Sequence, residues 1–253
     1  MTNLGVLYGL LQTGDVVFSD ELNHASIIDG CRISRCKVVV YKHNDMADLQ
    51  RLLETEIVTG QRFIVTDGVF SMDGDIADLP SLAVLKKQFN AFLIVDDAHG
   101  VGVIGNDGSG TASHYGLTDV IDLQVGTLSK ALAAEGGYVA GKKILIDYLI
   151  NRSRPFIFST ALAPATLAAA NAALLLLQTQ ASKYLDSLRA NSRLMRRLLL
   201  EGGLNVVEGI TPIIPVVIGE AGLTMQFADR LKSKGILVSG IRPPTVPRGE
   251  SRL

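Results

Sequence analysis

Short apolar runs rich in β-branched residues alternate along the chain with segments of helical periodicity. Two segments, 46–56 and 79–90, predict helices, and in the second Leu79, Leu82, Leu85 and Phe89 mark one face at helical spacing. The alternation of strands and helices predicts an α/β fold with a mainly parallel sheet. The predicted strands are Val16–Asp20, Lys37–Tyr41, 63–68, 92–97, 122–126 and 138–141.

The pattern changes from Pro164 onward. A long helical stretch over 164–203 is followed by short apolar segments, a further helix within 225–235 and an extended segment at 236–241. We therefore expect two domains: residues 1–165 form a large α/β domain, and residues 166–253 form a linking helix and a smaller α+β domain. The chain starts inside an apparent helix and stops inside an extended segment, so we expect a fragment that lacks both ends.

Composition and charge exclude several classes of protein. The 253 residues include 24 Lys and Arg against 25 Asp and Glu, and 47% of them are hydrophobic. Such a balance is typical of a globular protein and indicates neither a nucleic-acid partner nor a membrane surface. The most apolar stretch, AALLLLQ at 172–178, is too short for a membrane span. No leader is visible, and we expect a cytoplasmic protein.

Polar side chains cluster where several predicted strands end. They lie at 20–24, 67–71, 96–99 and 127–130. Open parallel sheets bind ligands at the carboxyl ends of their strands, so these segments predict one site at that edge.

Two glycine-rich stretches resemble nucleotide loops only in part. Gly100, Gly102 and Gly105 have G-x-G-x-x-G spacing, but NDGSG follows where a dinucleotide site needs a helix. A flexible glycine loop is the favoured interpretation, with a nicotinamide site as the alternative. The stretch GGYVAGKK fails as a phosphate loop because Lys143 stands where Ser or Thr should bind magnesium.

The acid–histidine pair near the glycine loop has two interpretations. Asp96, Asp97 and His99 could ligate a metal, but no further His or Cys cluster supports this, and we expect none. Lys130, in GTLSKAL, would by itself be an ordinary surface lysine. Together these residues form the set that pyridoxal phosphate requires: a lysine for the Schiff base, an acid for the pyridine nitrogen and hydroxyls for the phosphate.

The sequence resembles the α-oxoamine synthases, which are fold-type I, aspartate aminotransferase-like pyridoxal-phosphate transferases. They join an amino acid to an acyl thioester with loss of CO2. The stretch at 241–247 is most similar to the biotin-pathway members, which use L-alanine and a pimeloyl thioester; members that use glycine and acetyl-CoA are the alternative. The matching stretches are DELNHASIIDG, YKHND, VFSMDGD, VDDAHGVGVIG, GTLSKAL, GGYVAG, FIFSTALAP and IRPPTVP.

The resemblance implies a role for individual residues. Lys130 would bind the cofactor and remove the Cα proton, and Asp96 would pair with the pyridine nitrogen. His99 would bind the phenolic oxygen, and His24 would stack on the ring and contact substrate. No role follows for Asp97. Further implied contacts are Ser71 near the phenolic oxygen, Thr127 at the phosphate, Ser159 and Thr160 at the phosphate of a neighbouring subunit, and Thr245 at the substrate.

The resemblance also implies a homodimer whose acyl donor is bound to CoA or to a carrier protein. The family's Ser-Gly-aromatic phosphate segment would precede Thr2, and its carboxylate-binding arginine would follow Leu253. In addition, Ala133 replaces a usual glycine. We therefore expect a chain that has the lysine machinery but lacks part of its substrate contacts. A non-catalytic, cofactor-binding fragment is the alternative.

Overall fold

The computed structural model describes residues 1–253 and divides into two compact units. The first comprises Met1–Phe70 and Ile76–Leu185, and the second comprises Ser71–Asp75 and Asp186–Leu253. The domain boundary predicted after residue 165 lies inside one long helix, α8 (Pro164–Glu201), in which Gln180 has non-helical backbone angles. No helix of the chain is both long and apolar enough to span a bilayer.

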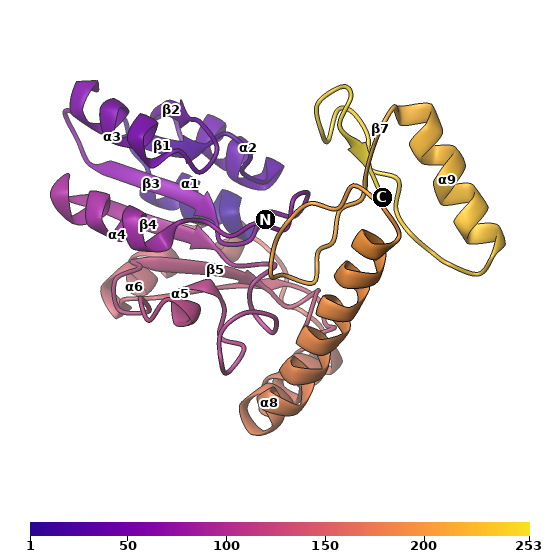
Figure 1. Cartoon of the computed structure of the whole chain (residues 1–253). Helices are drawn as coiled ribbons and strands as arrows, with labels where there is room; N and C mark the ends of the chain where they lie inside the picture. Colours follow the sequence, from indigo (N-terminus) through magenta and orange to yellow (C-terminus); the bar gives the residue numbers. More distant parts are fainter. The chain divides into compact units, whose positions relative to one another are not determined.

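The first unit is built on a six-stranded sheet in the order β2-β1-β3-β4-β5-β6 (Figure 1). Neighbours from β2 to β5 pair in parallel, and β6 pairs antiparallel with β5. This confirms the predicted α/β fold with a mainly parallel sheet. The strands are β1 (Val16–Asp20), β2 (Lys37–Tyr41), β3 (Arg62–Asp67), β4 (Ala91–Asp96), β5 (Leu123–Thr127) and β6 (Gly137–Gly141).

Both faces of the central strands of this sheet are buried, and neighbouring strand residues point to opposite sides. Phe18 belongs to one hydrophobic cluster, and its neighbour Val17 belongs to the other. Leu93 and Ile94 divide in the same way. The helices of this unit, besides the first part of α8, are α1 (Thr2–Leu10), α2 (Ala25–Ile33), α3 (Met46–Thr55), α4 (Leu79–Gln88), α5 (Thr111–His114), α6 (Lys143–Arg152) and α7 (Arg154–Ile157).

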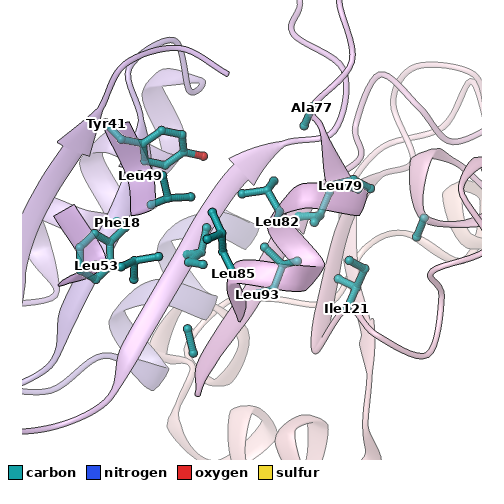
Figure 2. Close-up of a cluster of buried hydrophobic side chains, with 14 of the residues drawn as sticks. Phe18, Tyr41, Leu49, Leu53, Ala77, Leu79, Leu82, Leu85, Leu93 and Ile121 are labelled. Carbon is teal, nitrogen blue, oxygen red and sulfur yellow. The ribbon is translucent and has the colours of Figure 1, made fainter. Parts of the chain in front are cut away.

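The larger cluster lies between the sheet and helices α3 and α4. Leucines from both helices meet strand side chains there, and Figure 2 shows Leu49 and Leu53 beside Phe18, and Leu82 and Leu85 near Leu93. Burial of a Leu or Phe side chain stabilises the fold by about 1.5–3 kcal/mol. The sheet and its strand ends are therefore firmly anchored.

The second unit contains less regular structure. Besides the last part of α8, it has α9 (Ala221–Ser233) and a two-stranded antiparallel sheet of β7 (Val217–Gly219) and β8 (Ser251–Arg252). The Glu220 side chain caps α9 by accepting from the N–H groups of Gly222 and Leu223. Of the extended segment expected at 236–241, only Ile241 takes part in strand pairing, through a single bridge.

Candidate functional site

The candidate site lies at the carboxyl ends of the parallel strands of the first unit, as predicted. Asp67 is the last residue of β3 and Asp96 is the last residue of β4, and the two are paired in register. Both side chains are buried. The neighbouring strand β5 ends at Thr127, and the turn that follows carries Lys130. The topology of the sheet therefore brings the predicted acid and lysine to one edge.

Lys130 and His99 are in direct contact. Lys130 Nζ lies 2.7 Å from His99 Nε2. Desolvation, and then the Lys130 charge, lower the pKa of His99 to about 4, so its ring is neutral at pH 7. A neutral ring that accepts at Nε2 carries its proton on Nδ1, and the lysine is the donor. Desolvation also lowers the pKa of Lys130 against the opposing pull of Asp96 and Asp67.

The Asp96 carboxylate is held by donors at both oxygens. Asn3 Nδ2 donates to Oδ2 at 2.5 Å, and the Ala98 N–H donates to Oδ1 at 3.0 Å. Asn3 is itself buried. Sequence reasoning missed Asn3, because its bond to Asp96 joins positions 93 residues apart and its helix carries no motif. The two bonds fix the plane of the carboxylate and leave it an acceptor.

Asp67 is a second buried acid beside Asp96. Burial raises its pKa well above the usual range, the Asp96 charge raises it further, and Lys130 opposes this. Asp67 Oδ2 accepts the His24 N–H at 2.7 Å. Because two adjacent buried carboxyl groups resist sharing full charge, Asp67 is suited to hold a proton beside Asp96. The sequence placed Asp67 at this strand end but gave it no role.

His24 is the N-cap of α2. Its Nδ1 accepts the Ser26 N–H at 3.2 Å, and it lies 2.8 Å from Ser26 Oγ. The ring is exposed. The cap and the bond from the His24 N–H to Asp67 together hold the ring at this edge of the first unit. The role of His24 toward a cofactor stays a prediction.

Asp97 holds the glycine loop together. Its carboxylate accepts the Thr111 N–H at 2.6 Å and the Thr111 hydroxyl at 3.0 Å. A Cβ built on Gly100 or Gly110 would lie 1.9 Å from a carboxylate oxygen of Asp97, so glycine is required at both positions. Burial raises the pKa of Asp97 to about 6. The loop is thus a packed turn around Asp97, which gives a structural role to a residue for which the sequence suggested none.

The turn before Lys130 presents paired hydroxyl groups. Thr127 Oγ1 lies 2.7 Å from Ser129 Oγ, and it accepts the Ser129 N–H at 3.2 Å. Thr127 Oγ1 also donates to the Gly136 carbonyl at 3.1 Å. Hydroxyl and backbone N–H donors of this kind suit an anionic oxygen. Ser129 joins Thr127 as a candidate phosphate contact, and the hydroxyl-rich turn was its signal in the sequence.

Four further predicted site residues make no hydrogen bond with the strand-end cluster that the structure gives. Ser159 and Thr160 are exposed between α7 and α8, and no hydrogen bond joins them to the strand-end cluster. Ser71 and Thr245 belong to the second unit. Thr245 is an exposed turn residue in that unit. Ser71 begins the short segment Ser71–Asp75, in which Asp73 forms an ion pair with Arg252. The roles of all four residues stay predictions.

No group of three or more His, Cys, Asp or Glu side chains is arranged to hold a metal ion. The charged residues at the strand ends instead pair a lysine with an imidazole and place two acids beside them. This arrangement can hold a carbonyl compound on an amine and balance a positive ring nitrogen with a carboxylate.

Comparisons with known proteins agree with this chemistry. The family described as aminotransferase class I and II matches residues 2–253. The chain is 49% identical over 253 residues to 8-amino-7-oxononanoate synthase of Lysinibacillus sphaericus and covers 65% of that protein. It is 52% identical over 252 residues to the enzyme of the same name from Trichlorobacter lovleyi and covers 64% of it. The chain thus spans just under two thirds of the length of these relatives.

Solved structures give the same picture. A single-residue variant of serine palmitoyltransferase from S. paucimobilis, with a bound PLP-myriocin aldimine, superimposes with a TM-score of 0.93 at 30% identity, over 99% of this chain and 63% of that one. The 8-amino-7-oxononanoate synthase of Francisella tularensis superimposes with a TM-score of 0.84 at 32% identity, over 99% of this chain and 72% of that one. The fold-type I prediction is therefore confirmed.

Proposed function

The chain belongs to the aminotransferase class I and II family, and on this basis we propose that it is the cofactor-holding part of an 8-amino-7-oxononanoate synthase. The reaction joins L-alanine to a pimeloyl thioester and yields 8-amino-7-oxononanoate, CO2 and the free thiol of CoA or of a carrier protein. One observation carries the proposal: the 2.7 Å contact of Lys130 with a neutral His99, next to the buried Asp96.

The donor set of the first unit fits pyridoxal phosphate. Lys130 offers an amine, Asp96 a carboxylate whose two oxygens are already oriented, and His99 an imidazole in contact with the amine. When bound, the cofactor supplies an electron sink for the negative charge that develops on the amino-acid Cα. The residues that would hold it are Lys130, Asp96 at the pyridine nitrogen, His99 at the phenolic oxygen, His24 over the ring, and Thr127 and Ser129 at the phosphate.

The residues of the chain would divide the work of proton transfer. Lys130 removes the Cα proton and returns it later, and its lowered pKa increases the fraction of free amine that can do so. His99 accepts an N–H of Lys130 and keeps Nζ directed at the site. Asp67, beside Asp96, is the acid whose pKa burial raises well above the usual range, so it is suited to hold a proton next to the carboxyl group that would face the pyridine nitrogen.

We also propose a homodimer and a cytoplasmic location, as the resemblance implies. Large apolar side chains are exposed on and just after α7 and on the first part of α8: Phe156 is 66%, Phe158 is 71% and Leu175 is 51% exposed. Exposed large apolar side chains of this kind are suited to a protein interface. Ser159 and Thr160 follow directly in sequence, which supports their proposed reach toward a neighbouring subunit.

The test is deuterium exchange at Cα, followed by NMR in heavy water with added pyridoxal phosphate. We expect the chain to exchange the α-proton of L-alanine and Lys130→Ala to be slower by about 10²–10⁴-fold, the usual contribution of a positioned base. Lys143→Ala, which removes an exposed lysine paired only with Asp147, should exchange at the original rate.

Adding pimeloyl thioester to the same sample should then release CO2 and thiol. Faster exchange of glycine, with turnover of acetyl-CoA, would replace our assignment by the glycine-using alternative. Absence of exchange with either amino acid would show that this chain is a non-catalytic fragment.

A further inference from the structure

Two residues without a predicted role connect His24 to Asp96. Asn3 Nδ2, from α1, lies 2.5 Å from Asp96 Oδ2 and 2.9 Å from Ser26 Oγ. Ser26 Oγ lies in turn 2.8 Å from His24 Nδ1. The hydrogen bonds therefore run without interruption from the carboxylate at the end of β4, through α1, to the imidazole at the start of α2.

The direction of each bond in this series follows from the groups at its two ends. Asp96 Oδ2 accepts from Asn3, so the group that faces it is the NH2 of the amide. The same nitrogen has a second hydrogen, which it donates to Ser26 Oγ. The Ser26 hydroxyl has one hydrogen, which it donates to His24 Nδ1 when that ring nitrogen carries no proton.

The backbone adds a second donor to the same ring atom. Ser26 N–H points at His24 Nδ1 from 3.2 Å. A nitrogen that accepts from both a hydroxyl and an amide carries no proton, so the single ring proton of the neutral imidazole lies on Nε2. The bond from the His24 N–H to Asp67 Oδ2, at 2.7 Å, fixes the backbone on which this geometry depends.

We propose that Asn3 and Ser26 are positioning residues that set the tautomer of His24. Through them, the negative charge of Asp96 makes His24 Nε2 a hydrogen-bond donor toward whatever binds over the exposed ring. The inference rests on the proposed function only in giving His24 a ligand to face. The tautomer itself is a property of the chain alone and can be measured without cofactor, substrate or turnover.

The test is NMR of the chain labelled with ¹⁵N-histidine, without cofactor, at a pH where the His24 ring is neutral. The chain has four histidines, so His24→Gln identifies the signals of interest. We expect Nδ1 of His24 to show the shift of an unprotonated ring nitrogen and Nε2 that of a protonated one. Loss of one neutral hydrogen bond should change a tautomer ratio by about three- to tenfold. Asn3→Ala and Ser26→Ala should each shift the ratio toward Nδ1–H by that factor.

The controls separate this effect from a change in fold. Ser26→Thr keeps the hydroxyl and should restore the original ratio. Ser182→Ala removes an exposed serine from α8 and should leave the His24 signals unchanged. Protonation at Nδ1 in the unmodified chain, or an unchanged ratio in both folded variants, would overturn the proposal. Failure of Lys130 to bind the cofactor would count against the proposed function and would not alter this result.

Discussion

Each of the two units is stabilised internally by a different kind of interaction. Every member of the two hydrophobic clusters lies in the first unit, and all five residues of β1 are buried. In the second unit, the most deeply buried side chains are polar: Thr224, Ser251, Thr211 and Arg252. The first unit is therefore ordered by apolar burial, which is additive and tolerant. The second depends on a few polar contacts that fail when one partner is removed.

Arg252 illustrates the second kind of order. Its guanidinium pairs with the Asp73 carboxylate and lies 3.1 Å from Glu250 Oε2, while its side chain is only 5% exposed. Thr211 donates to the Gly74 carbonyl at 2.6 Å in the same region. These bonds explain why the Ser71–Asp75 segment is compact with residues far along the chain.

Truncation of a leucine to alanine should have the most different effects in the two units, because in the first unit it leaves a cavity. Leu93 is fully buried in the larger cluster, whereas Leu223 on α9 is 43% exposed. Leu93→Ala should lower the free energy of unfolding by about 2–5 kcal/mol. Leu223→Ala should change it by at most about 0.5 kcal/mol. Urea denaturation followed by circular dichroism measures both, and equal losses would contradict the comparison.

Removal of the buried arginine should affect the second unit alone. Arg252→Met leaves Asp73 without its cation, and we expect a local loss of about 2–3 kcal/mol, less than for a fully buried pair because Asp73 is 29% exposed. Hydrogen exchange should show faster exchange at 71–75 and 251–252 and unchanged exchange in β1 and β4. The exposed Arg248→Met is the control. Faster exchange in β4 would show that the units are not independent in this respect.

The turn around Asp97 tests whether polar contacts also matter in the first unit. Thr111→Val keeps the shape of the side chain but removes its hydroxyl bond to Asp97. Because Thr111 is completely buried, we expect a loss of about 1–2 kcal/mol in the free energy of unfolding. Thr118→Val, at an exposed position, should have no measurable effect. A neutral result for Thr111 would mean that the glycine loop does not need this bond.

The pH dependence of stability should contain a smaller contribution from His99. Its pKa is about 4 in the folded chain against an ordinary 6.5, so between these values the unfolded chain binds more protons. The contribution is complete above pH 6.5 and is lost as the pH falls toward 4. We expect about 1–2 kcal/mol, after allowance for a partly exposed ring.

His99→Gln isolates this contribution from that of Asp97. The pKa of Asp97 is raised to about 6, and its contribution is lost as the pH rises from about 4 to 6, which is the opposite sign. The difference in unfolding free energy between the unmodified chain and His99→Gln should therefore shrink as the pH falls from 6.5 to 4. A constant difference would contradict the lowered pKa.

Much of the first unit could be predicted from the sequence, since its strands are marked by apolar runs. The expected strands at Val16–Asp20 and Lys37–Tyr41 agree with β1 and β2 to the residue. Because Asp96, His99 and Lys130 follow the ends of neighbouring predicted strands, they could also be expected to lie close together. Asn3 escaped it because nothing local marks a residue whose partner is 93 positions away.

The second unit shows the limit of pattern reasoning. The segment at 236–241 is apolar, but it has no long neighbouring strand, and only Ile241 pairs. The glycine loop was equally hard to interpret, because the need for Gly100 and Gly110 comes from the Asp97 carboxylate and not from a ligand. Periodicity reports burial in the first unit, but it does not report which polar groups a turn must accommodate.

The most direct test of the account is to identify the lysine that binds pyridoxal phosphate. The chain is mixed with the cofactor and reduced with borohydride, and the digest is analysed by mass spectrometry. We predict a single adduct on Lys130, and no specific adduct in Lys130→Ala. Adducts on another lysine, or spread over surface lysines such as Lys143, would contradict the claim that the strand ends of the first unit form the cofactor site.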